Sequence, residues 1–150
     1  MSNNTIKRIS IDEFYKCSNI WDLKKCPFTD KFIEEIKSGN RMTFAYEKEN
    51  VFIGEGSLVM HCDEEGYTIT GKRVYLSRLI VKKECRNKGI GGAILDYLIN
   101  KANEMGFSEI SLGVDTDNED ALHLYRKYGF EIFETAEDEY GTYYRMLRKL

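Results

Sequence analysis

The sequence of 150 residues is poor in the features that divide or anchor a chain. It has one proline, Pro27, and no proline-rich or Gly/Ser-rich stretch that would indicate a linker. No stretch approaches the roughly 18 uninterrupted apolar residues of a membrane span, and the polar start MSNNTIKR lacks the apolar core of a secretory signal. We therefore expect a single domain over residues 1–150, located in the cytoplasm and without a membrane partner.

The sequence also lacks an excess of positive charge. Lys and Arg number 22 against 25 Asp and Glu, and no basic run is interleaved with aromatic residues. Proteins that bind a phosphate backbone need such a basic footprint, so we expect no nucleic-acid partner. Hydrophobic residues make up 42% of the chain, which is enough to build a buried core and argues against disorder.

Cysteine is present four times but never in a CxxC pair. A metal site drawn from Cys17, Cys26, His61 and Cys62 would fit no zinc spacing, so we expect no metal. We expect four reduced, partly buried thiols.

Capping signals and periodicity predict the elements of the first half of the chain. Ser10 and Glu13 form a capping box that opens a short helix, and Thr29 caps a second helix that stops at Ser38-Gly39-Asn40. Strands are predicted at 5–9, 41–47 and 51–61, the last two as a hairpin, with a polar loop over 62–73.

The pattern then becomes strand, glycine loop, helix, strand and helix, which is typical of a parallel crossover. Predicted elements are a strand at 74–81, a helix at 91–105 ended by Gly106, a strand at 109–115, a helix capped by Asp117 or Asn118 and stopped by Gly129, and strands at 130–134 and 143–150. The sequence thus predicts an α/β fold.

The junction Arg86-Asn87-Lys88-Gly89-Ile90-Gly91-Gly92 is suited to bind an anion. Glycines let backbone N–H groups approach a ligand closely, and the helix that follows adds the positive end of its dipole. A pyrophosphate fits this description, and a tight connection without a ligand is the alternative. The dinucleotide fingerprint G-x-G-x-x-G is broken at Ile94, and the triphosphate motif GxxxxGK[ST] is absent.

The flanking residues decide between these interpretations. The spacing Arg86-x-x-Gly89-x-Gly91, followed by Asn118-x-x-Ala121-x-x-Leu124-Tyr125-x-Lys127-x-Gly129-Phe130, resembles the GNAT family of acetyl-CoA-dependent N-acetyltransferases. The resemblance extends over residues 74–130. It implies a GNAT-type acyl-CoA N-acyltransferase fold, with a mixed, mostly antiparallel sheet flanked by helices and one parallel crossover.

The resemblance also implies where acetyl-CoA binds. The backbone of Leu79, Ile80 and Val81 would pair with the pantetheine arm, and the loop would hold the pyrophosphate through Arg86, Asn87, Lys88, Gly89, Ile90, Gly91 and Gly92. Asn118 would contact the pantetheine while also serving as a helix N-cap. Tyr125 would lie beside the thiol as a general acid, the alternative being a core aromatic residue.

The resemblance assigns no general base, because Tyr75 and Gly113 stand where some relatives carry a carboxylate. Glu55 is our candidate, since strand alternation places it on one face with Ile53 among apolar neighbours. An ion pair with Arg78 is its alternative role. Other candidates are water, Asp115 and the group Glu137, Asp138 and Glu139. Cys85 is not needed as a nucleophile if transfer is direct.

The expected reaction is direct transfer of the acetyl group of acetyl-CoA to a primary amine. Acidic residues favour a cationic small molecule as the acceptor. Two alternatives stay open at this point: acetylation of a peptide or protein amino terminus, and a cofactor-binding regulatory or interaction domain without turnover. A homodimer is also left open.

Overall fold

The computed structural model describes residues 4–150, so Met1, Ser2 and Asn3 of the polar start lie outside the described residues. One seven-stranded sheet has the order β1-β2-β3-β4-β5-β7-β6. All neighbouring strands are antiparallel except β4 and β5, which are parallel. The strands are β1 (Asn4–Arg8), β2 (Arg41–Lys48), β3 (Val51–Val59), β4 (Arg73–Val81), β5 (Glu109–Asp115), β6 (Glu131–Asp138) and β7 (Gly141–Lys149).

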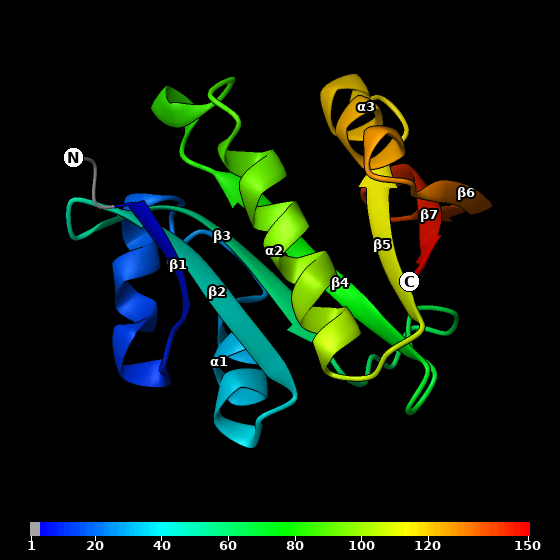
Figure 1. Ribbon diagram of the computed structural model, residues 1–150, viewed down its shortest axis with the longest axis horizontal. Coiled ribbons are helices and arrows are strands. Elements are labelled where there is room, and N and C mark those ends of the chain that lie inside the picture. Colours follow the sequence, from blue (N-terminus) through cyan, green and yellow to red (C-terminus); the bar gives the residue numbers. More distant parts are fainter. Residues whose placement is uncertain (1–3) are drawn as a thin grey trace.

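Helices cover both faces of the sheet, and α2 (Ile90–Glu104) lies along one of them (Figure 1). It shares a hydrophobic core with α3 (Glu119–Lys127), in which Ile94, Leu98 and Leu122 are buried. The opposite face carries the 3-10 helix η1 (Ile11–Asn19) and α1 (Thr29–Ser38), which bury Phe14 and Phe32 in a second cluster. A 3-10 turn, η2 (Lys83–Cys85), precedes the glycine loop. Within residues 4–150, no helix is both long and apolar enough to cross a membrane.

The parallel pair of strands is joined only at one end. Residues 73–75 of β4 pair with residues 109–111 of β5, and no pairing continues beyond Tyr75 and Ser111. On its other edge β4 contains a bulge, because Ser77 and Leu79 oppose adjacent residues of β3 and Arg78 is left over. Arg78 adopts a φ of 67°, which is uncommon for a residue with a side chain. The second half of β4 is therefore free to diverge from β5.

A second bulge changes the environment expected for Glu55. Tyr46 opposes Gly54 and Glu47 opposes Phe52, so Ile53 is the extra residue on β3. Ile53 consequently packs in the core beneath α2, whereas Glu55 lies on the opposite face, across from Ala45 of the second cluster. The prediction that Glu55 shares a face with Ile53 was wrong, because alternation does not continue through a bulge.

Other differences concern the ends of elements. Thr29 is the first residue of α1 and not its cap, and its hydroxyl donates to the Leu23 carbonyl oxygen at 2.6 Å. The short helix after Ser10 is a 3-10 helix, opened as expected by a hydrogen bond from the Ser10 N–H to the Glu13 carboxylate at 3.3 Å. Strand β6 continues to Asp138, four residues beyond its predicted end at residue 134.

Candidate active site

A cavity of about 640 Å³ opens where β4 and β5 diverge. Its walls combine residues from β4, β5, α3, the β3–β4 connection and the β6–β7 hairpin. Four tyrosines and three acidic residues dominate the lining, which comprises Glu64, Tyr67, Tyr75, Leu76, Arg78, Leu79, Ile80, Gly113, Val114, Asp115, Asn118, Ala121, Tyr125, Asp138 and Tyr143. The cavity is thus both aromatic and acidic.

The α3 wall brings together several of the residues predicted to bind acetyl-CoA. Asn118 caps α3 by accepting a hydrogen bond from the Ala121 N–H at 3.2 Å, and both residues line the cavity. Leu79 and Ile80 line it from β4, and their pairing with β3 leaves the edge toward β5 without a strand partner. An extended chain could therefore hydrogen-bond to β4 on this side.

Tyr125 projects from α3 into the same cavity. Its ring is 7% exposed and packs edge-on against Phe130, with 5.9 Å between ring centroids. Burial raises the pKa of Tyr125 to about 12, so its hydroxyl is neutral at pH 7 and can donate a hydrogen bond. Tyr125 is therefore both a core residue, as the alternative interpretation expected, and a cavity residue.

The glycine loop at the end of β4 has the backbone of an anion site. Asn87 and Gly89 adopt φ angles of 63° and 82°, and α2 begins directly afterwards at Ile90. The first turn of α2 contains no acidic residue, which leaves its exposed N–H groups and dipole uncompensated. Arg86 is anchored by a hydrogen bond from its Nε to the Val81 carbonyl oxygen at 3.0 Å. The loop itself lies outside the lining of the cavity.

The lining also contains residues that were not predicted as site residues, among them Glu64 and Tyr143. The Tyr143 hydroxyl donates to the Glu64 carboxylate at 3.2 Å, and an Arg145 Nη lies 3.7 Å from the same carboxylate. Glu64 belongs to the polar loop predicted over 62–73, and no sequence signal assigned it to the site. Of the predicted candidate bases, Asp115 and Asp138 line the cavity, but Glu137 and Glu139 do not.

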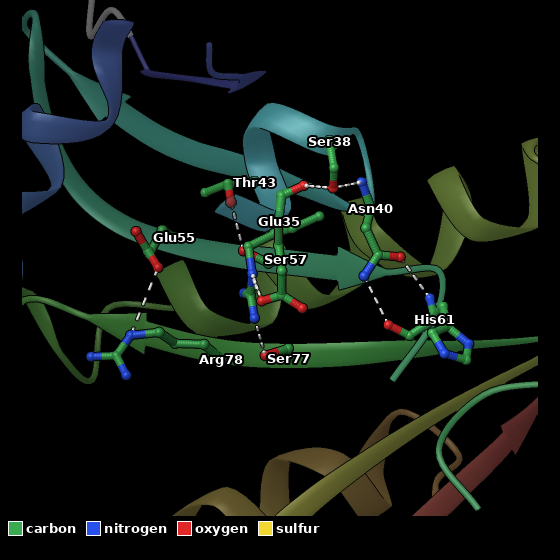
Figure 2. A network of polar contacts seen from close by, with 10 residues as sticks. Glu35, Ser38, Asn40, Thr43, Glu55, Ser57, His61, Ser77 and Arg78 are labelled. Carbon is green, nitrogen blue, oxygen red and sulfur yellow. Dashed lines mark hydrogen bonds and ion pairs between the residues drawn. The ribbon is translucent and has the colours of Figure 1, made fainter. Parts of the chain in front are cut away.

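Glu55 lies outside the cavity lining, on the face of the sheet that carries η1 and α1. It is 2% exposed, and its Oε1 lies 3.8 Å from the Nε of Arg78, the arrangement expected for the ion-pair alternative (Figure 2). The Arg78 guanidinium stacks 4.0 Å from the ring centroid of Trp21 and also lines the cavity. The neighbouring Cys17 is fully buried, and burial raises its thiol pKa, so it is not a nucleophile. Within residues 4–150, no cluster of three or more His, Cys, Asp or Glu residues could hold a metal ion.

Comparison with known proteins identifies the family. The family model of the acetyltransferase (GNAT) family matches residues 6–130. The chain belongs to this family. The GNAT chain is thus an acetyl-CoA-dependent N-acetyltransferase, which confirms the resemblance carried by its glycine loop and α3.

Relatives of this GNAT chain span different kinds of acetyltransferase. The probable N-acetyltransferase san of Drosophila melanogaster is 30% identical over 81% of this chain and 68% of its own length. N-alpha-acetyltransferase 50 of Danio rerio is 31% identical over 75% of this chain and 65% of its own length. Among solved structures, a GNAT family acetyltransferase from Elizabethkingia anophelis with acetyl-CoA bound has a TM-score of 0.76 at 17% identity, covering 99% of each chain. The predicted fold class is confirmed.

Proposed function

We propose that the chain transfers acetyl from acetyl-CoA directly to the primary amine of a cationic small molecule. One observation carries this proposal: a single cavity between β4 and β5 has the Tyr125 phenol on one wall and the acidic groups Glu64, Asp115 and Asp138 on its lining. A donor on the cofactor side and negative charge on the acceptor side are what this reaction needs.

The proposed binding mode of acetyl-CoA follows the free edge of β4. The pantetheine arm would hydrogen-bond to the backbone of Leu79, Ile80 and Val81, which has no strand partner toward β5. The pyrophosphate would bind the residues of the glycine loop, where the amino terminus of α2 offers N–H groups. Asn118 would reach the pantetheine from α3 with the amide nitrogen that its capping oxygen leaves free.

The reaction then needs one nucleophile and one acid. The amine nitrogen attacks the thioester carbonyl carbon and forms the N–C bond, the C–S bond breaks, and the leaving sulfur takes the proton of the Tyr125 hydroxyl. The Tyr125 phenolate then takes a proton back from water. The proton of the amine passes to water or to a carboxylate of the lining.

We propose that Glu55 is the ion-pair partner that holds Arg78 at the cavity. Glu55 itself lies outside the lining, whereas Arg78 is part of it.

The acceptor class is proposed from charge. Three carboxylates and one arginine line the cavity, so its lining favours a cation. A peptide amino terminus is a second candidate, supported by the similarity to N-alpha-acetyltransferase 50.

A panel of three amines distinguishes these acceptors. CoA release is measured with spermidine, kanamycin and a heptapeptide that has a free amino terminus, with the same heptapeptide acetylated at its amino terminus as the control. Turnover with spermidine or kanamycin supports the proposal, and turnover with the free heptapeptide alone replaces it with the second candidate. Acetyl-CoA binding without turnover of any of the three amines would contradict both acceptor candidates.

A further inference from the structure

The connection between β3 and β4 is fastened to the sheet at three consecutive carbonyl groups. Each accepts a hydrogen bond from a side chain of a strand: Glu65 from Arg145 at 2.9 Å, Gly66 from Arg73 at 2.8 Å, and Tyr67 from Ser111 at 2.5 Å. Ser111 is fully buried, so its hydroxyl needs a hydrogen-bond partner inside the protein, and the Tyr67 carbonyl oxygen is that partner. The backbone at Tyr67 is therefore held in place relative to β5 and β7.

The ring of Tyr67 is held as firmly as its backbone. It stacks on Tyr75 with 4.3 Å between ring centroids and an interplanar angle of 25°, and the Arg145 guanidinium lies 5.1 Å from its centroid. Tyr67 is only 3% exposed although it lines the cavity. Burial raises the pKa of its hydroxyl, so the group is a neutral phenol that can both donate and accept a hydrogen bond.

Gly113 of β5 provides the space for this hydroxyl. Its neighbours Leu112 and Val114 point into the core under α2, so residue 113 faces the other side of the sheet and lines the cavity. A Cβ at residue 113 would overlap the Tyr67 hydroxyl oxygen, but it would lie 3.4 Å from the ring carbon Cζ, an ordinary contact. The backbone of Gly113 is not in the left-handed region, so only the Tyr67 hydroxyl requires a glycine there.

Tyr67 and Tyr125 lie on opposite sides of the opening between the strands. Tyr125 belongs to the core under α2 and α3, on the side proposed for acetyl-CoA. Tyr67 covers the other face of β5, beside Glu64 and Tyr143. An acceptor that approaches the thioester from this side meets the Tyr67 hydroxyl.

We propose that Tyr67 binds the acceptor amine, through the hydroxyl that the β3–β4 connection places over Gly113. The phenol oxygen accepts a hydrogen bond from an N–H of the neutral amine, which leaves the nitrogen lone pair free to attack the acetyl carbonyl. This inference rests on the proposed function, because it assigns the acceptor side of the same cavity.

The test uses two substitutions that remove the hydroxyl from its place in different ways. Tyr67→Phe deletes the oxygen and keeps the stack on Tyr75, whereas Gly113→Ala adds a methyl group where the oxygen lies. Steady-state kinetics with spermidine, kanamycin and the free heptapeptide are measured for the parent, both variants and the double variant. Tyr97→Phe is the matched control, because Tyr97 packs against Phe44 beneath α2 and lines no part of this cavity.

Each single variant should lower kcat/KM for the acceptor roughly 10- to 100-fold, the loss expected for one hydrogen bond at a desolvated site. KM for acetyl-CoA should stay within about two-fold of the parent value. The double variant should be no worse than Tyr67→Phe alone, since the added methyl group then meets only ring carbon. Tyr97→Phe should match the parent.

Two results would overturn the inference. Parental kcat/KM for the acceptor in Tyr67→Phe would show that the hydroxyl does not bind the amine. Losses that multiply in the double variant would show that the two residues act independently. A parent enzyme that acetylates none of the three amines would instead contradict the proposed function and the inference together.

Discussion

Gly91 offers a test in which stability and ligand affinity should change in opposite directions. The residue lies in the first turn of α2 with ordinary helical geometry, and an added Cβ would lie 3.7 Å from both Leu124 Cδ2 and Val81 Cγ2. The free protein therefore has room for a methyl group. Because glycine also leaves the unfolded chain more freedom than alanine, Gly91→Ala should stabilise the fold by about 0.4–1 kcal/mol. For a domain of this size that corresponds to a rise in Tm of roughly 1–4 °C.

The same methyl group should weaken acetyl-CoA binding. It would fill space between the amino terminus of α2, β4 and α3, where we propose that the cofactor passes from its pyrophosphate to its pantetheine arm. Crowding of a close contact costs about 1–3 kcal/mol, or roughly 5- to 150-fold in affinity. Calorimetric titration with acetyl-CoA measures this loss, and a thermal melt of the unliganded protein measures the gain in Tm.

Gly106 at the other end of α2 supplies the matched control. Its φ is 90° and nothing lies within 4 Å of an added Cβ, so Gly106→Ala introduces backbone strain alone. It should lower the free energy of unfolding by about 1–2 kcal/mol without changing acetyl-CoA affinity. Unchanged affinity in Gly91→Ala would refute the assignment of the loop to the cofactor, and a lower Tm would refute the packing argument.

Three further predictions concern the ionisable groups. Tyr125→Phe should keep acetyl-CoA affinity and lower kcat by roughly 10- to 1000-fold, since the leaving thiolate loses its acid; parental kcat would make Tyr125 a wall residue. Glu55→Gln should lower Tm, because Arg78 loses its charged partner, and should leave kcat near the parent value; disappearance of the acidic limb of the pH–rate profile would instead make Glu55 the base. Burial raises the pKa of Tyr75 and Tyr125 to about 12 and also raises that of Tyr67, so above pH 10 the unfolded chain loses protons that the fold retains. The free energy of unfolding should then fall by about 1.4 kcal/mol per pH unit for each group, and the stabilisation from each group is fully present below pH 10. Chemical unfolding at pH 8 to 11 measures this slope. A flat profile would contradict the burial of these phenols.

The second half of the chain was predictable because its signals are local. The glycine loop, the cap at Asn118 and the stop at Gly129 each act within a few residues, and the structure places α2, β5 and α3 close to the predicted ranges. Local signals do not predict a feature that depends on pairing with another strand, such as the face of the sheet on which a side chain lies. The bulge at Ile53 reverses the face of Glu55, and only the pairing of β3 with β2 creates that bulge.

The acceptor side that we propose for the site was not predictable for the same physical reason. Tyr67 follows Gly66 in a loop whose composition indicates only solvent exposure, and Gly113 is one glycine in a strand. Their relationship exists only after Ser111 and Arg145, both distant in sequence, fasten the loop to the sheet. A sequence pattern cannot show a contact that depends on three separate strands.

The incomplete pairing of β4 and β5 also bears on solubility. Beyond Tyr75, β4 presents a free strand edge in the middle of the sheet, a kind of edge that elsewhere recruits strands of other chains into aggregates. Here the edge faces a cavity of about 640 Å³ whose lining includes residues of α3 and of the β3–β4 connection. We propose that the pantetheine arm, which contains two amide groups, pairs with this edge. By occupying that edge, bound acetyl-CoA would protect the protein against edge-to-edge association as well as supply the acetyl group.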